Sequence, residues 1–101
     1  MQTHHLKTHT LSFDAIKFGD KSFEVLKNDR FFQRGDTVVL RNFNPVIGAY
    51  VRALGDGNTM ICDEAETLTF RVGAVLQGGQ FGIEPGYCVF SLIPLEEPSN
   101  G

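Results

Sequence analysis

Residues 19–30 have the sequence GDKSFEVLKNDR and lead on to a Gly-Asp pair at 35–36. Seven of these twelve side chains are charged or amide groups, and they flank a short alternating segment at 23–26. Alternation with a period of two is typical of a strand with two different faces. A strand that serves only the core rarely carries so many charged groups. The stretch therefore predicts a strand, ended by a turn at 28–30, that lines a functional site.

The segment before this stretch predicts one strand and one helix. Residues 5–9 alternate, which indicates a first strand, and a helix of about two turns is expected to follow. Thr10 or Ser12 is expected to cap this helix, Asp14 to lie in its first turn, and Gly19 to end it. The apolar face expected for the helix consists of Leu11, Phe13, Ile16 and Phe18.

The segment after this stretch predicts a series of short strands separated by Gly, Asn and Pro turns. Phe31 or Phe32 is expected to anchor the loop that follows the first of them. Strands are expected at 37–41, 49–54, 59–62, 67–76 and 87–93, with turns at 42–48 and 55–58 and a glycine-rich loop at 77–86. The predicted fold class is mainly β with one or two short helices (α+β), arranged as a small antiparallel or mixed β-barrel.

The length and composition predict one compact domain over residues 1–101, with a flexible acidic tail from residue 94. The chain has nine Phe and no Trp, so its core is expected to depend on phenylalanine. The sequence has neither an apolar run of membrane length nor a signal-peptide pattern, and a cytoplasmic location is expected. Cys62 and Cys88 are expected to be buried thiols in a reducing compartment.

Charge is distributed unevenly along the chain. The net charge of −3 argues against a strong nonspecific binder of DNA or membranes. Residues 1–52 hold eight Lys and Arg against five acids, whereas residues 53–101 hold one against seven. This asymmetry is compatible with a locally basic binding face and equally with ordinary solvated surface.

The pattern Gly19-x-Lys21-x-x-Glu24 resembles the signature of ASCH domains, a branch of the PUA-like superfamily. The longer segments 19–36 and 78–87 are similar to a narrower group of small bacterial and phage-encoded proteins of unassigned function. The likeness covers about residues 4–93. The resemblance implies a PUA-like barrel with a cleft beside the first helix and the following strand. It also implies RNA binding, which is common among PUA-like domains.

One position departs from the ASCH pattern. The pattern usually has an arginine two residues after the glutamate, where this chain has Leu26. Positions 24 and 26 of a strand face the same way, so Glu24 lacks its usual cationic neighbour there. A carboxylate in a cleft needs water or another partner, and Lys21, Lys27 and Arg30 are the cations that could supply one.

The residues predicted to bind the ligand are Lys21, Glu24, Lys27, Asn28, Arg30, Gln80 and Phe81. Lys27, Asn28 and Arg30 are placed to contact a nucleobase edge or a phosphate. Gln80 and Phe81 are expected to cover the ligand, with the ring stacking on a base. The structural alternatives are a surface ion pair between Lys21 and Glu24, a solvated turn at 28–30, and a hairpin loop held by Phe81 in the core.

The first function hypothesis is a binding module for RNA or a nucleoside-like small molecule. Some small ASCH proteins hydrolyse the amide of acetylated cytidine, which gives an alternative amidohydrolase function with Lys21 and Glu24 as catalytic candidates. A third possibility is a phage accessory protein that binds a host protein through its acidic half. No cofactor, metal or membrane partner is expected, since His4, His5 and His9 have no accompanying cysteine or acidic ligands. The sequence leaves the oligomeric state open.

Overall fold

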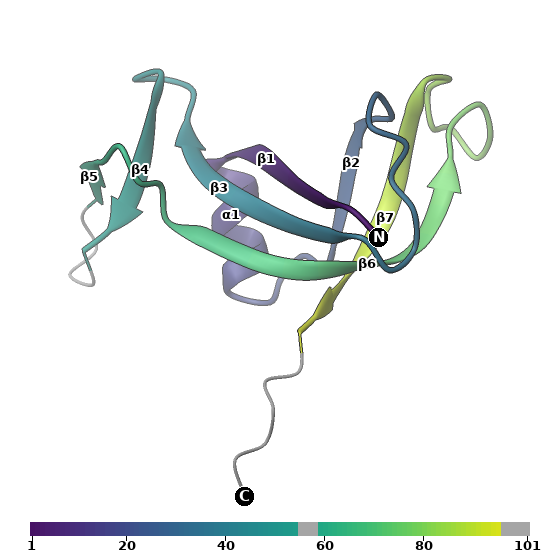
Figure 1. The fold of residues 1–101 in the computed structure, drawn as a ribbon. Helices are drawn as coiled ribbons and strands as arrows, with labels where there is room; N and C mark the ends of the chain where they lie inside the picture. The colour runs from purple at the N-terminus through teal and green to yellow at the C-terminus, as the bar shows by residue number, and fades with distance from the viewer. Residues whose placement is uncertain (55–58, 96–101) are drawn as a thin grey trace, which may run out of the picture. The chain divides into compact units, whose positions relative to one another are not determined.

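The computed structural model describes residues 1–54 and 59–95 of the chain. In this part, seven strands and one helix form a mainly β fold, as predicted. The elements in chain order are β1 (Thr3–His9), α1 (Thr10–Lys17), β2 (Phe23–Lys27), β3 (Thr37–Asn44), β4 (Ala49–Ala53), β5 (Thr59–Ile61), β6 (Thr67–Gln77) and β7 (Tyr87–Pro94) (Figure 1).

The strand boundaries differ from the predictions mainly where alternation continues through turn-forming residues. β3 extends to Asn44, because Asn42 turns inward and is buried like the residues two and four positions before it. β7 includes Pro94, where the flexible tail was expected to begin. The predicted turn at 55–58 and the predicted tail beyond residue 95 lie outside the described residues.

The strands form a sheet in the order β2-β7-β6-β3-β4-β5, and β1 pairs with β3. The pairs β2/β7, β6/β7, β3/β4 and β4/β5 are antiparallel. The chain divides into two compact units. We call them the loop unit (Met1–Thr3, Ser22–Val38 and Thr69–Gly101) and the helix unit (His4–Lys21 and Val39–Leu68).

The helix unit has its core on one face of β1, β3 and β4. Alternate residues of these strands are buried, which is the pattern of strands with one face against a core. The buried side chains of this unit are His4, Leu6, Thr8, Phe13, Ile16, Leu40, Asn42, Val51 and Ala65. The opposite face of the strands, which carries Lys7 and Arg41, is exposed or half-buried.

The helix begins and packs differently from the prediction, and ends as predicted. Its N-cap is His9, which makes no side-chain capping hydrogen bond, so neither Thr10 nor Ser12 is the cap. Because the helix starts at Thr10, no acidic residue lies in its first turn. Gly19 has a φ of 86°, and its N–H donates to the Ile16 carbonyl, as expected for a glycine that ends a helix.

The predicted apolar face of α1 is only half correct. Phe13 and Ile16 are buried, whereas Leu11 and Phe18 are 83% and 73% exposed. The helix ends at Lys17, so Phe18 is its C-cap residue, and Leu11 is the one large apolar residue of the helix outside the buried stripe.

An ion pair fixes the end of α1 within the helix unit. Lys17 Nζ donates to Glu66 Oε2 at 2.5 Å, and the Ala53 N–H donates to Glu66 Oε1 at 3.0 Å. Partial burial works to raise the pKa of Glu66. The hydrogen bonds from Lys17 and Ala53, together with the charges of Lys17 and Arg52, outweigh it and hold that pKa below its ordinary value.

The loop unit is built around β7. Its strand lies between β2 and β6, and β6 has an irregularity in register between Val72 and Val75. Phe90 is fully buried, and Phe32 packs against it with ring centroids 5.0 Å apart. Of the two residues expected to anchor the loop after β2, Phe32 does so and Phe31 does not.

No helix in the described part of the chain is long and apolar enough to cross a membrane.

Candidate functional site

The predicted site residues fall into both units. Six of them belong to the loop unit, namely Glu24, Lys27, Asn28, Arg30, Gln80 and Phe81. Lys21 belongs to the helix unit, where its Nζ donates to Ser12 Oγ at 2.5 Å and its side chain is half-buried. Lys21 therefore belongs to a different unit from the other six predicted site residues.

Glu24 points into the core of the loop unit. Along β2, Phe23, Val25 and Lys27 are exposed, while Glu24 is only 4% exposed. Glu24 lies opposite the buried Phe90 of β7, so its side chain shares the inward face. Glu24 and Lys27 thus project to opposite faces of the strand, because their positions differ by an odd number. They do not form one charged wall.

Asn28 joins the segment after β2 to the glycine-rich loop. Its backbone N–H donates to the Gly86 carbonyl at 2.9 Å, and its Nδ2 donates to Gln77 Oε1 at 2.7 Å. Its Oδ1 accepts from the Phe32 N–H at 3.3 Å. Asn28 therefore ties the segment after β2 to the glycine-rich loop through its backbone and to the end of β6 through its side chain.

The glycine-rich loop, residues 78–86, closes as a tight hairpin. The Ile83 N–H donates to the Gln80 carbonyl at 2.9 Å, and both intervening residues have positive φ, 51° for Phe81 and 78° for Gly82. Positive φ at both central positions is the mark of a type I′ turn, where Asn and Gly are the favoured residues. Gln80 Nε2 donates to the Gln77 carbonyl at 2.9 Å, which fixes its side chain at the base of the loop.

Phe81 projects away from the protein instead of into it. Its side chain is 84% exposed, so the structural alternative of a loop held by Phe81 in the core is wrong. The loop closes instead through a close backbone approach at Gly78, where an added Cβ would lie 2.1 Å from the Glu84 carbonyl oxygen. The loop thus keeps its shape through its backbone, and the ring at its tip is not needed for packing.

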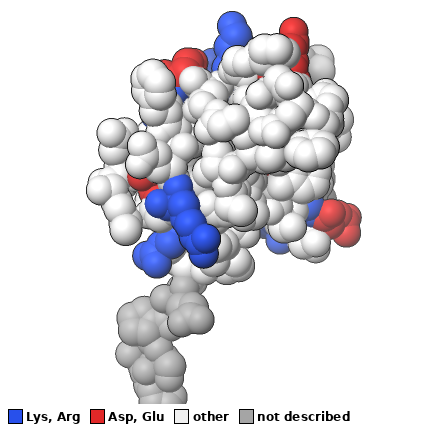
Figure 2. Space-filling view, turned by 90° about the vertical axis from the view of Figure 1, so that its right-hand side faces the viewer, with Lys and Arg blue, Asp and Glu red and all other residues white. Residues whose placement is uncertain are grey.

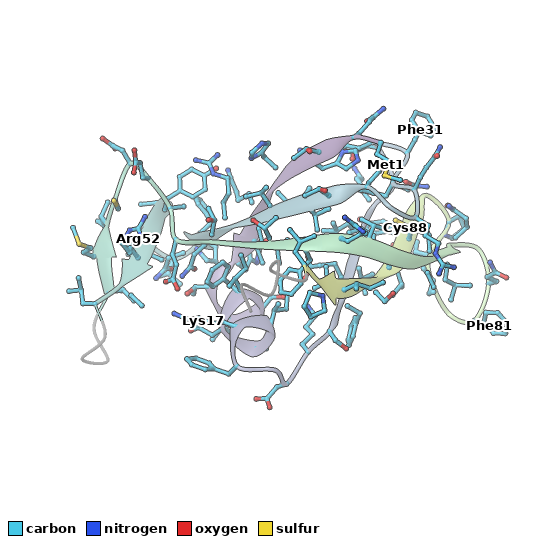
Figure 3. All side chains as sticks on the ribbon, turned by 60° about the horizontal axis from the view of Figure 1, so that its bottom comes forward. Met1, Lys17, Phe31, Arg52, Phe81 and Cys88 are labelled. Carbon is cyan, nitrogen blue, oxygen red and sulfur yellow. The ribbon has the colours of Figure 1, made fainter. Side chains whose placement is uncertain are left out.

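Phe31 is a second exposed phenylalanine in the same backbone conformation. Its φ is 51° and its side chain is 78% exposed. Phe31 and Phe81 are the non-glycine residues with positive φ in the described part of the chain. Figure 3 shows both rings projecting outward from loops at the same end of the sheet. The sequence predicted a functional role for Phe81 but not for Phe31, because two adjacent phenylalanines give no signal of which one is buried.

Cations accompany these rings. Lys27, Arg30 and Arg34 are exposed in the segment that carries Phe31. Figure 2 shows a mostly uncharged face, with lysine and arginine side chains at its top and near its lower end. Contacts with an anion on this side are therefore restricted to a few positions.

Cys88 lies beneath these loops in β7, opposite Leu26. Burial raises the pKa of its thiol, and the negative charge of Asp29 raises it further. Cys88 is fully buried as predicted, whereas Cys62 is only half-buried. The raised pKa keeps the Cys88 thiol protonated near neutral pH, which disfavours a nucleophilic role.

Two hollows lie elsewhere on the described surface. One of about 440 Å³ is in the helix unit, between the start of α1 and the β3–β4 turn, and is lined by residues 9–12 and 44–46. One of about 300 Å³ is in the loop unit and is lined by Arg71 and residues 93–95. None of the predicted site residues lines either hollow.

The three histidines do not converge. His4 is buried on the inward face of β1, while His5 and His9 lie on its exposed face. Among residues 1–54 and 59–95, no group of three or more His, Cys, Asp or Glu side chains is placed to hold a metal ion.

Comparison with known proteins identifies the family. A family model described as a domain of unknown function (DUF3850) matches residues 3–92, nearly the whole chain, so the protein belongs to this family. No curated protein matched the chain.

Proposed function

We propose that this member of the DUF3850 family is a cytoplasmic, PUA-like module that binds single-stranded RNA or a nucleoside-like ligand at the two loops joined by Asn28. In this proposal Phe31 and Phe81 stack on bases, while Lys27 and Arg30 contact phosphate. The observation that carries it is the pair of exposed phenylalanines held at positive φ.

The backbone at these two positions supports the proposal through its energetic cost. A non-glycine residue in the left-handed region costs about 1–2 kcal/mol, and an exposed ring recovers little of it by packing. Backbone strain of this kind is found mainly at functional sites, where it fixes a side chain in the orientation that a ligand needs. A ring presented to solvent on a fixed turn is suited to stacking on a base, because every nucleobase has a π face.

The surrounding polar groups support the same ligand class. Lys27 and Arg30 lie within a few residues of Phe31, as phosphate contacts should lie beside a stacked base. The fixed amide of Gln80 lies next to Phe81 and can hydrogen bond to a base edge. The net charge of −3 favours a local contact of this kind over broad electrostatic attachment to a polyanion.

The amidohydrolase alternative would place Lys21 and Glu24 at the reacting amide of a modified nucleoside such as acetylated cytidine. Glu24 is 4% exposed, and the Lys21 amine donates to Ser12 Oγ. These positions favour binding over this particular catalysis. Incubation with acetylated cytidine tests the alternative, and turnover that is lost in Lys21→Ala would restore it.

A nuclear magnetic resonance titration with a short single-stranded RNA of mixed sequence tests the binding proposal. Amide shifts are expected in the two loops. Phe31→Ala and Phe81→Ala are each expected to weaken binding by about 5- to 100-fold, the effect of one stacked base. The matched control is Phe18→Ala, which removes a ring of similar exposure from the helix unit. Absence of loop shifts at millimolar RNA, or an equal loss in the control, would overturn the proposal.

A further inference from the structure

A second surface of the molecule combines cations with aromatic rings. On the outward face of the helix unit, Lys7 comes from β1, Arg41 and Phe43 from β3, and Tyr50 from β4. We call these four residues the cation–aromatic face. We propose that this face is a binding surface for single-stranded nucleic acid, separate from the loops at Phe31 and Phe81.

The four side chains form one continuous stack. Lys7 Nζ lies 4.4 Å from the centroid of the Phe43 ring, and the rings of Phe43 and Tyr50 meet edge to face at 5.4 Å. The Arg41 guanidinium lies 4.2 Å from the centroid of Tyr50, and its Nη1 also lies 3.3 Å from the Tyr50 hydroxyl oxygen. Three strands thus hold two adjacent rings with a cation at each end of the pair, without help from a loop.

The charge of this surface is opposite to that of the whole chain. The β1, β3 and β4 strands contain no Asp or Glu, whereas the chain as a whole has a net charge of −3. Arg52 is a further cation on β4, but its Nη2 donates to the Glu64 carbonyl, so we leave it out of the face. A cationic strip on an acidic protein attracts a polyanion locally.

The magnitudes favour a nucleic acid as the occupant. A cation over an exposed ring is worth about 0.5–1 kcal/mol, whereas a base stacked on that ring is worth about 1–3 kcal/mol. An incoming base can therefore displace Lys7 or Arg41 from its ring. The released cation then gains a phosphate of the same strand, so both parts of the stack find partners on one ligand. An acidic peptide would satisfy the cations but leave the rings without a base.

The face lies on strands, which gives it an advantage over a flexible site. Residues already held in a sheet lose little conformational freedom on binding. This proposal does not depend on the loop site, because the face consists of residues of the helix unit and the loop site of residues of the loop unit.

The test uses fluorescence anisotropy of a labelled single-stranded RNA over a series of salt concentrations. Arg41→Gln and Lys7→Gln are each expected to reduce the slope of log K against log salt by about 0.7, the value for one phosphate contact on a single strand. Arg71→Gln, which removes an exposed strand arginine of the loop unit, is the matched control and should leave the slope unchanged. Tyr50→Ala should weaken binding, and Tyr50→Phe, which keeps the ring, should largely restore it.

The outcomes separate the two proposals. Loss of affinity in the face variants alone would support the face and overturn the loop site, while loss in Phe31→Ala and Phe81→Ala alone would do the reverse. Loss in both sets would support both, and loss in neither would overturn both. Equal binding of a polyglutamate peptide, or failure of Tyr50→Phe to restore affinity when circular dichroism shows it folded, would overturn the assignment of the face to nucleic acid.

Discussion

The loop unit and the helix unit place aromatic rings at the surface by opposite means. In the loop unit, Phe31 and Phe81 lie at turn positions with positive φ, and both rings are largely exposed. In the helix unit, Phe43 and Tyr50 lie on regular strands, are half-buried, and are each covered by a cation. The first arrangement costs backbone energy, whereas the second contributes to the packing of the sheet.

This difference gives a criterion for telling rings that stabilise the fold from rings that could serve the proposed binding. A ring that packs on its neighbours is explained by stability alone, so its function must be argued from charge and composition. A ring that is exposed on a strained turn has no such explanation, and its presence is itself an argument for a ligand. Substitutions in each unit test this contrast, beginning with the residues on which each unit depends most.

Replacement of the central phenylalanine of either unit should have the largest effect. Phe90 of the loop unit and Phe13 of the helix unit are both fully buried, and Phe90→Ala or Phe13→Ala should each cost about 3–5 kcal/mol of unfolding free energy. Because β3 and β6 each run through both units, we expect one cooperative transition. Urea unfolding followed by circular dichroism measures both quantities.

The two tyrosines allow each unit to be followed by itself. Tyr50 belongs to the helix unit and Tyr87 to the loop unit, and the chain has no tryptophan. In Tyr87→Phe the fluorescence reports on the helix unit, and in Tyr50→Phe it reports on the loop unit. If Phe90→Ala shifted the unfolding transition seen by Tyr87 but not the one seen by Tyr50, the two units would unfold independently.

The next largest loss of stability should come from Gly78→Ala, which introduces a side chain where the two ends of the Phe81 loop approach each other. Its Cβ would lie 2.1 Å from the Glu84 carbonyl oxygen and 2.6 Å from that of Tyr87. Crowding of this kind costs about 3 kcal/mol. In the same loop, a Cβ at Gly82 meets nothing within 4 Å, so Gly82→Ala should cost only the strain of its positive φ, about 1 kcal/mol. Thermal denaturation measures both losses of stability. If Gly78→Ala and Gly82→Ala lost the same amount, the backbone around Gly78 would have moved to make room for the added Cβ.

Much of the fold could be predicted from the sequence, because many of its elements are determined by the residues within them. Alternation of apolar and polar residues predicted the strands β1, β2 and β6, and a glycine at position 19 predicted the end of the helix. The structure has all four features. The cap of α1 was predicted wrongly, since Thr10 and Ser12 are both residue types that favour this position and the chain uses neither. The helix is held by the burial of Phe13 and Ile16 and not by a side-chain cap.

The candidate site was less predictable, because it depends on which face each residue presents. The sequence predicted that Glu24 and Lys27 contact the same ligand, but alternation along β2 sends their side chains to opposite faces. The roles of Phe31 and Phe32 depend on one positive φ that no local signal marks. The cation–aromatic face was missed because Lys7 is far in sequence from Arg41 and Tyr50, and the three meet only when their strands pair.

Relief of the strain at Phe81 or Phe31 should make the protein more stable and less able to bind. Asn is tolerated in the left-handed region, so Phe81→Asn and Phe31→Asn should each raise the unfolding free energy by about 1 kcal/mol. Phe43→Asn in the helix unit should do the opposite, because it removes a packed ring from a strand. A loss of stability in Phe81→Asn would mean that this ring packs on the protein, and the contrast between the units would fail.

The smallest effect should be a pH dependence that arises in the helix unit from Glu66. Its pKa is lower in the folded protein than the ordinary value of 4.5, so the folded state favours the ionised form. The stabilisation is therefore complete above that value and is lost as the pH falls through the lower, folded pKa. Glu66→Gln keeps an oxygen for the Ala53 N–H but has no charge for Lys17, so its stability should change less over this acidic range.

The ion pair is partly exposed, and its contribution should not exceed about 1 kcal/mol. Urea unfolding of wild type and Glu66→Gln at a series of acidic pH values measures the difference between the two curves. Lys17→Met should flatten the curve in the same way, because it removes the partner that favours the charged carboxylate. Since Phe31 and Phe81 carry no titratable group, Phe81→Asn should shift the wild-type curve by a constant amount at every pH. A pH-dependent shift in Phe81→Asn would show that the strained loop and the ion pair are energetically coupled.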